Sequence, residues 1–133
     1  MHELALAEGI VATALKAAGG RRVCRIVVAV GELQQIDARA FRDCLEQVVP
    51  PGEAALAGVH IDLQAQPARL QCRACRCDFG LADLPDPPGA DELEAIHFVP
   101  ELAHSWLACP QCGSPDFEIT AGRGIWIDHI EVD

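Results

Sequence analysis

Two short segments decide the fold of this chain: Cys72-Arg73-Ala74-Cys75 and Cys109-Pro110-Gln111-Cys112-Gly113, with 33 residues between the two pairs. We call them the first and the second hook. Each has the spacing Cys-x-x-Cys, in which a tight turn points both sulfur atoms at one ion. Together the hooks offer four thiolates, the donor set of a closed tetrahedral zinc site. A closed shell leaves no position for water or substrate, so we expect a structural zinc and no catalysis at this metal.

The three other cysteines are interpreted differently. Cys77 extends the first hook to Cys-x-x-Cys-x-Cys, and Cys75 with Cys77 is the alternative pair. Because a two-residue gap is the usual chelate spacing, Cys77 is interpreted as a bystander or a transient ligand. Cys24 and Cys44 fall on predicted core faces and are interpreted as small buried hydrophobes.

Composition limits the class of protein. The chain has 133 residues, half of them apolar, and a formal net charge of −10. This charge argues against binding of nucleic acid through its phosphates and favours a basic partner surface or a cationic cargo. The N-terminus lacks the basic region of a secretory signal, and no apolar run is long enough for a membrane span. We therefore expect a cytoplasmic protein, in which paired cysteines bind metal.

Hydrophobic periodicity predicts an α+β fold. A small three-stranded sheet with two helices is expected, and the hooks form an inserted four-cysteine, zinc-ribbon-like module. The predicted boundaries are 1–68 for the α+β domain, closed by a strand in 120–133, and 69–119 for the zinc module. The expected helices are 4–18 and 38–48, the second capped by Asp37, and the expected strands are 23–30, 59–66, 117–120 and 125–132.

The start of the chain, Met1-His2-Glu3, has a specific metal chemistry. The α-amine, the amide nitrogen of His2 and its imidazole close adjacent chelate rings on one ion. Planar nitrogen donors suit Ni²⁺ or Cu²⁺, and the Glu3 carboxylate is available to complete or tune the site. A solvated terminus without metal is the alternative interpretation.

Several of these segments, in this order and length, resemble the HypA/HybF family of nickel metallochaperones for [NiFe]-hydrogenase maturation. They are Met1-His2-Glu3-Leu4-Ala5-Leu6-Ala7, Gly31-Glu32-Leu33-Gln34 and both hooks. The resemblance covers essentially the whole chain. The tract from Ile96 to Glu101 through Cys109 to Ser114, together with Gly122-Arg123-Gly124, is similar to the branch of the family with a long insertion between the hooks.

The resemblance implies a nickel carrier that is not an enzyme. It makes His2 the nickel ligand, assisted by the Met1 amine, and Glu3 a tuning carboxylate. Asp37 and His97 are implied as further nickel ligands. For Asp37, a role as an N-cap is an equally good local explanation. For His97, the alternative is a loop histidine packed against Phe98 or Trp106. The four hook cysteines match the structural zinc site.

The implied partners are a HypB-type GTPase and the [NiFe]-hydrogenase large subunit, with urease as a further recipient in some members. Neither nucleic acid nor membrane is expected, and a monomer or a homodimer fits. Two other classes stay open: a zinc-ribbon module that binds protein or nucleic acid without nickel, and a thiol redox enzyme that uses one Cys-x-x-Cys pair.

Overall fold

The computed structural model describes the backbone of residues 2–133 and the side chains from Glu3 onward. It contains two compact units. The first comprises the chain up to Val30, Ile36–Gln64 and Ile125–Asp133, and the second comprises Gly31–Gln35 and Ala65–Gly124. Each unit is described by itself.

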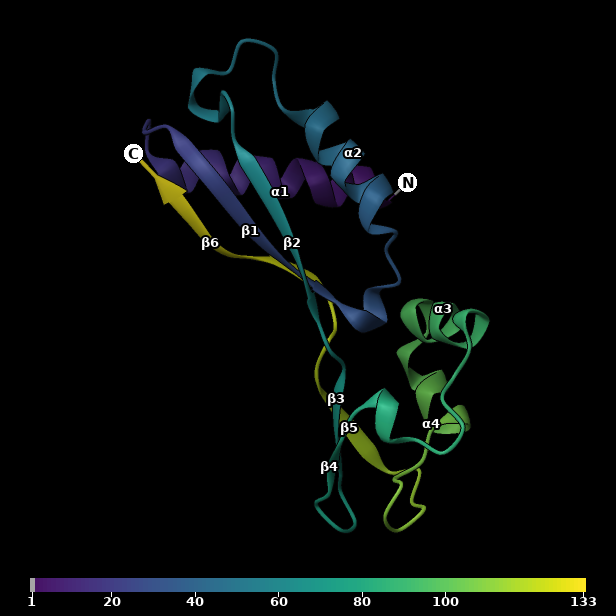
Figure 1. Cartoon of the computed structure of the whole chain (residues 1–133). Coiled ribbons are helices and arrows are strands. Elements are labelled where there is room, and N and C mark those ends of the chain that lie inside the picture. The colour runs from purple at the N-terminus through teal and green to yellow at the C-terminus, as the bar shows by residue number, and fades with distance from the viewer. Residues whose placement is uncertain (1) are drawn as a thin grey trace. The chain divides into compact units, whose positions relative to one another are not determined.

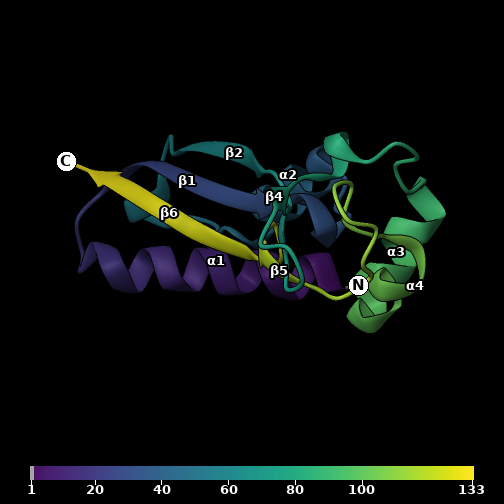
Figure 2. The same cartoon turned by 90° about the horizontal axis from the view of Figure 1, so that it is seen from below.

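The first unit is built on a three-stranded sheet in the order β2-β1-β6 (Figure 1), as predicted. Its strands are β1 (Val23–Gly31), β2 (His60–Gln66) and β6 (Ile125–Val132). The last strand of the chain pairs antiparallel with β1, from Val23 opposite Val132 to Val30 opposite Ile125. The two predicted helices are also present, α1 (His2–Ala18) and α2 (Ala38–Val48). In Figure 2, α1 runs along the length of this sheet.

The core of the first unit explains why these segments are helices. Ala7, Val11, Ala14 and Ala18 recur at helical spacing in α1, and all are buried. In α2 the buried residues are Phe41 and Leu45. They meet the inward side chains of the sheet in one cluster, which includes Val23, Ile26, Val28 and Ile61. Burial of this apolar surface stabilises the unit.

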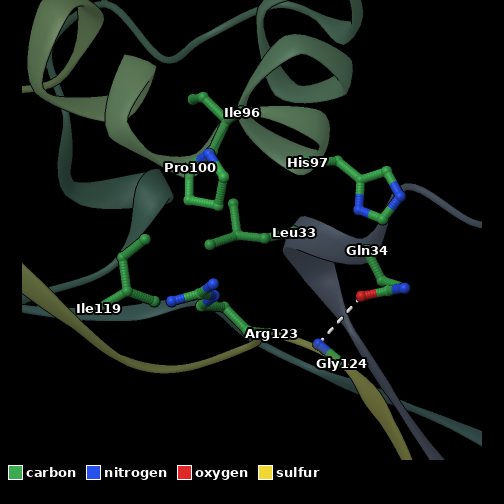
Figure 3. A pocket seen from close by; sticks show the side chains of 8 residues that line it. All are labelled: Leu33, Gln34, Ile96, His97, Pro100, Ile119, Arg123 and Gly124. Carbon is green, nitrogen blue, oxygen red and sulfur yellow. Dashed lines mark hydrogen bonds between the residues drawn. The ribbon is translucent and has the colours of Figure 1, made fainter.

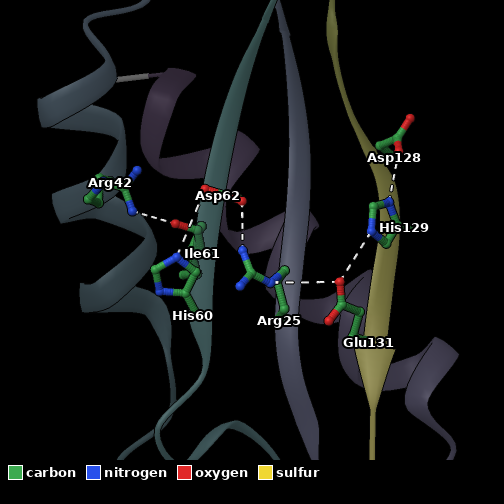
Figure 4. A network of polar contacts seen from close by, with 8 residues as sticks. All are labelled: Arg25, Arg42, His60, Ile61, Asp62, Asp128, His129 and Glu131. Carbon is green, nitrogen blue, oxygen red and sulfur yellow. Dashed lines mark hydrogen bonds and ion pairs between the residues drawn. The ribbon is translucent and has the colours of Figure 1, made fainter.

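A polar network crosses the three strands of this sheet (Figure 4). Arg25 on the central strand lies 2.8 Å from a carboxylate oxygen of Asp62 and 3.7 Å from one of Glu131. His129 on β6 hydrogen-bonds to Asp128 at 2.8 Å. Because these side chains are exposed, each pair contributes little stability by itself.

The second unit contains a sheet that the sequence did not predict, in the order β4-β3-β5. Its strands are β3 (Arg69–Cys72), β4 (Asp78–Phe79) and β5 (Phe117–Ala121). Two helices follow β4, α3 (Ala90–Phe98) and α4 (Ala103–Trp106). The 3-10 turns of this unit are η1 (Glu32–Gln34), η3 (Leu81–Asp83) and η4 (Pro100–Leu102), whereas η2 (Ala54–Leu56) lies in the first unit. The rings of Phe79 and Phe117 meet edge to face, with centroids 6.0 Å apart, in the core of this unit.

Two glycine-containing segments cross at very close range in the second unit. The amide of Gly31 donates to the carbonyl of Gly124, and the amide of Leu33 donates to that of Gly122, both at 2.9 Å. A Cβ atom on Gly31 would lie 2.3 Å from the Gly122 oxygen. The Glu32 carboxylate accepts a hydrogen bond from the Ala68 amide at 2.8 Å. The 31–34 segment is therefore fixed to the second unit at three backbone positions.

Two cysteines outside the hooks differ in their surroundings. Cys44 is half-buried and packs against the core of the first unit, as predicted. Cys24 is also half-buried, but its thiol lies 2.9 Å from a carboxylate oxygen of Asp133. This hydrogen bond raises the pKa of Cys24. The interpretation of Cys24 as a small buried hydrophobe was therefore wrong.

Within residues 2–133, no helix is both long and apolar enough to cross a bilayer.

Candidate metal centre

The two hooks bring their four sulfur atoms together. One ligand atom each from Cys72, Cys75, Cys109 and Cys112 lies within 4.8 Å of the others. The Sγ atoms of Cys72 and Cys112 are 3.5 Å apart, and those of Cys75 and Cys109 are 3.6 Å apart. Four sulfurs at a zinc–sulfur distance of about 2.3 Å in a tetrahedron lie about 3.8 Å from one another. The donor set and its spacing therefore fit Zn²⁺.

Both hooks are positioned by the second sheet. Cys72 is the last residue of β3, and the chain returns after the first hook as β4. The second hook precedes β5, which pairs antiparallel with β3 and places Phe117 opposite Cys72. Figure 1 shows the two hook loops at the same end of this sheet. The pairing of β3 with β5 thus joins segments that are distant in the sequence.

Backbone amides of the hooks favour the thiolate forms of Cys72 and Cys109, which are the forms that bind a cation. The amide of Cys75 points at the Cys72 sulfur at 3.5 Å, and the amide of Gln111 points at the Cys109 sulfur at 3.4 Å. The Cys75 amide is the largest influence on Cys72 and lowers its pKa. Burial opposes ionisation of Cys109, but amides of the second hook outweigh it and lower its pKa to about 6.

The other two thiols hold their protons more tightly. For Cys75 the Cys77 amide favours the thiolate, but burial and the sulfur of Cys109 outweigh it and raise the pKa to about 12. The pKa of Cys112 is also raised, against the effect of the Ser114 amide, by the sulfur of Cys72 and by burial. Four thiolates this close repel one another unless a cation lies between them, as a bound metal would.

Cys77 lies outside the four-sulfur cluster. It is half-buried, and its thiol is 3.5 Å from the carbonyl oxygen of Asp78. Among the side chains that the structure describes, the group able to hold a metal through three or more ligands is formed by the hook cysteines alone.

The predicted N-terminal nickel residues are described in part. Met1 and the side chain of His2 lie outside the described residues. The backbone of His2 begins α1, and Glu3 is a half-buried acidic residue in its first turn.

Asp37 caps α2, as predicted. Its Oδ1 atom accepts hydrogen bonds from the amides of Arg39 at 2.9 Å and Ala40 at 3.0 Å. One carboxylate oxygen is thereby occupied.

His97 and His104 lie on helices of the second unit. His97 is half-buried in the last turn of α3, and its ring centroid is 5.0 Å from that of Phe98. The Nδ1 atom of His104 is 2.8 Å from the Pro115 carbonyl, and its ring lies 4.6 Å from that of Phe117. His104 therefore has a local structural role.

The structure also brings together residues that no sequence pattern links. His97 shares a cavity with Leu33, Gln34 and Arg123 (Figure 3). Leu33 and Arg123 belong to short segments noted only for their resemblance to a family. Their proximity follows from the backbone hydrogen bonds between these segments, which no hydrophobic pattern predicts.

Comparison with known proteins gives a consistent result along the whole chain. A family model described as "Hydrogenase/urease nickel incorporation, metallochaperone, hypA" matches residues 1–132. The hydrogenase maturation factor HypA of Thermococcus onnurineus is 38% identical over 138 residues, which cover 100% of this chain and 96% of that protein. HypA of Thermococcus kodakarensis is 38% identical over 136 residues, with the same coverage.

Two solved structures share the fold. The solution structure of the nickel metallochaperone HypA from Helicobacter pylori superposes with a TM-score of 0.61 at 19% identity and covers 98% of this chain and 96% of that one. A second solution structure of a HypA protein gives a TM-score of 0.63 at 20% identity, with 99% and 96% covered.

Proposed function

Because the chain belongs to the HypA family of nickel metallochaperones for hydrogenase maturation, we propose that it carries Ni²⁺ on Met1, His2 and Glu3. The family is not enzymatic, and this chain has a nickel-carrying role with a four-cysteine site that fits zinc. We assign nickel binding to a domain of residues 1–68 and 120–133, and zinc binding to residues 69–119.

The observation that carries this proposal is the start of α1 at His2. The first amides of a helix have no acceptor within the helix, so the backbone nitrogen of His2 is available to a metal. The α-amine and the imidazole then complete a planar set of nitrogen donors, which suits Ni²⁺. A dication at the positive end of a helix dipole is disfavoured, and the Glu3 carboxylate in the first turn offsets that cost.

A terminal chelate also suits a carrier. It has few ligands and no closed shell, so an acceptor protein is able to remove the ion by exchanging one ligand at a time. The four thiolates of the hooks, in contrast, form a complete shell, which suits a metal that stays. Cargo and structural metal are thus assigned to two different donor sets.

Asp37 and His97 are included as further nickel ligands. Asp37 has one carboxylate oxygen engaged by helix amides, which leaves Oδ2 for a metal. His97 is half-buried at the end of α3, and the imidazole of histidine is a common metal ligand. Their contribution would tune an ion already held by His2.

The partners proposed are a HypB-type GTPase and the hydrogenase large subunit, with urease as an additional recipient. Nucleic acid is disfavoured, because no Lys or Arg occurs between Arg76 and Arg123, whereas acidic residues are frequent there. The GTPase assignment predicts a complex of the two purified proteins that survives gel filtration.

The decisive experiment counts metals by native mass spectrometry after addition of Zn²⁺ and Ni²⁺. We expect one nickel per wild-type chain, none in His2→Ala, and none when a residue is added before Met1. His60→Ala is the matched control, since His60 is an exposed histidine on β2. Zinc content should be the same in all four proteins. Nickel retained at full stoichiometry in His2→Ala would contradict the proposal.

A further inference from the structure

The second unit contains a cavity of about 330 Å³ whose floor is apolar (Figure 3). Leu33 and Ile96 on the floor are 4% and 1% exposed, and the half-buried Pro100 and Ile119 complete it. The remaining lining residues are Gln34, His97, Arg123 and Gly124. A cavity of this size with an apolar floor and a few polar groups has the composition of a ligand site.

Arg123 provides the charge of this cavity. It is exposed, and among the side chains described from Glu3 onward none forms a hydrogen bond or an ion pair with it. In Figure 3 its guanidinium lies on one side of Leu33, while His97 and Gln34 lie on the other. Arg73, which lines an adjoining hollow together with Arg123, is already 2.9 Å from the Asp116 carboxylate. An anionic ligand would therefore be attracted to Arg123.

Gln34 is held in place at the opposite side. Its Oε1 atom accepts a hydrogen bond from the Gly124 amide at 3.0 Å. This bond fixes the orientation of the side-chain amide, and it does not use the NH₂ group as a donor. The cavity thus combines a fixed polar group, a guanidinium and an aliphatic floor.

A second hollow of about 260 Å³ adjoins the first and shares Pro100, Ile119 and Arg123 with it. Its other lining residues are more polar, namely Arg73, Glu101, His104, Phe117 and Glu118. Arg123 therefore lies where the two hollows meet. A ligand that fills both must extend in two directions from the group that contacts Arg123.

We propose that these two hollows bind the carboxyl terminus of a partner polypeptide whose last residue is aliphatic. A terminal residue carries both required groups on one Cα atom. Its carboxylate would pair with the Arg123 guanidinium, and its side chain would lie on Leu33 and Ile96. The preceding residues would cross the second hollow, where Glu101 and Glu118 favour a basic side chain. Capture of a chain terminus by its carboxylate is a known mode of peptide recognition.

Other anions fit less well. A small aliphatic carboxylate would fill the first hollow and leave the second empty. A nucleic acid offers phosphate but no aliphatic group for the floor, and the chain's net charge of −10 repels it. His97, which we propose as a further nickel ligand, lines the first hollow, so the inference is tested in the absence of nickel.

The test uses the full chain, loaded with zinc and free of nickel. The probe is the peptide acetyl-Lys-Ala-Leu with a free carboxyl terminus, titrated by calorimetry and by ¹H–¹⁵N NMR. We expect saturable binding with shifts at the amides of Leu33, Gln34 and Gly124. The same peptide with a C-terminal amide should bind at least about tenfold more weakly, since it loses a charge-assisted hydrogen bond.

Variants separate a specific site from general charge effects. Arg123→Gln should weaken binding of the acid peptide to the level of the amide. The matched control Arg39→Gln, which removes an exposed arginine from α2 in the first unit, should leave binding unchanged. The NMR spectrum of each variant reports its fold independently of binding.

Three results would overturn the inference. The first is equal affinity for the acid and the amide peptides. The second is unchanged binding in a folded Arg123→Gln variant. The third is an affinity for 4-methylpentanoate equal to that for the peptide, which would make a small carboxylate the ligand. Because nickel is absent from every titration, these results are independent of whether His2 binds nickel.

Discussion

Arg76 and Gly113 occupy equivalent positions, each directly after the second cysteine of a hook, and each has a positive φ, 67° for Arg76 and 76° for Gly113. The equivalence extends to the hydrogen bonds around them. The amide of Arg76 donates to the Cys72 carbonyl at 3.0 Å, and that of Gly113 donates to the Cys109 carbonyl at 2.8 Å. The two hooks therefore have the same turn, but only the second has the residue that this turn favours.

The first prediction follows from this difference. Arg76→Gly should stabilise the zinc-loaded protein by about 0.5–1 kcal/mol, because the strain of a left-handed non-glycine residue exceeds the added entropy of glycine in the unfolded chain. The reciprocal change Gly113→Ala should destabilise it by about 1 kcal/mol. Urea unfolding measures both. Equal effects of the same sign in the two variants would contradict the equivalence.

Gly31→Ala should destabilise the protein by about 2–3 kcal/mol. Its added Cβ would lie 2.3 Å from the Gly122 carbonyl oxygen, so the crossing of the two segments would have to open. The matched control is Gly9→Ala in α1, where an added Cβ meets nothing within 4 Å. That control should stabilise the helix by about 0.5–1 kcal/mol. Thermal unfolding distinguishes them by opposite shifts of the midpoint.

Asp37 offers a test that separates capping from nickel binding. Asp37→Ala should cost about 1 kcal/mol of stability, because the amides of Arg39 and Ala40 lose their acceptor. Asp37→Asn should keep most of the cap, since asparagine is an equally good N-cap residue. If Asp37 also binds nickel, Asp37→Asn should weaken nickel binding at nearly unchanged stability. Calorimetry with Ni²⁺ and a denaturation curve on the same sample decide between the roles.

His129 should make stability depend on pH. Its hydrogen bond to Asp128 raises its pKa, and the charge of Glu131 acts in the same direction. A group with a raised folded-state pKa stabilises most below its unfolded pKa, about 6.5, and this contribution is lost as the pH rises through the folded-state value. The difference in stability between wild type and His129→Gln should therefore shrink from pH 5.5 to pH 8.5.

A double variant checks the cause of that pH dependence. In a background of Asp128→Asn with Glu131→Gln, the effect of His129→Gln should no longer vary with pH, because both carboxylates that raise its pKa are gone. An NMR titration of the His129 ring in the wild type gives the pKa directly. A value at or below that of an unperturbed histidine would refute the prediction.

The zinc site predicts a contrast between a thiol inside the four-sulfur cluster and one outside it. Cys112→Ser removes one of the four clustered ligands and should abolish stoichiometric zinc at neutral pH, with loss of folded structure in the second unit. Cys77→Ser is the matched control, since Cys77 lies outside the cluster, and should retain about one zinc per chain. Zinc analysis and circular dichroism report both. Zinc retained by Cys112→Ser but lost from Cys77→Ser would assign Cys77 as a ligand.

Local sequence patterns predict much of the first unit. Apolar residues at helical spacing predicted a helix over 4–18, and α1 lies there, with Ala7, Val11, Ala14 and Ala18 buried on one face. Asp37 marks the start of α2 through its own side chain. The structure confirmed both. These features are predictable because each depends on residues within one or two turns of one another.

The second sheet was missed for a physical reason. Its strands β3 and β4 are too short to show periodicity, and β3 gains its stability from pairing with Phe117–Ala121, far along the chain. The hook spacing predicted that four sulfurs meet, but not the sheet that brings them together.

The sequence by itself indicated the donor sets: four thiolates at chelate spacing, which the structure brings together, and His2, which we propose as a nickel ligand. Donor type and short spacing set such chemistry locally. Only the tertiary structure decided which distant residues share a surface. Leu33, Ile96 and Arg123 line one cavity, and two backbone segments cross beside it at Gly31 and Gly122, where a Cβ atom on Gly31 would meet the Gly122 carbonyl. That crossing depends on long-range contacts, which no local pattern encodes.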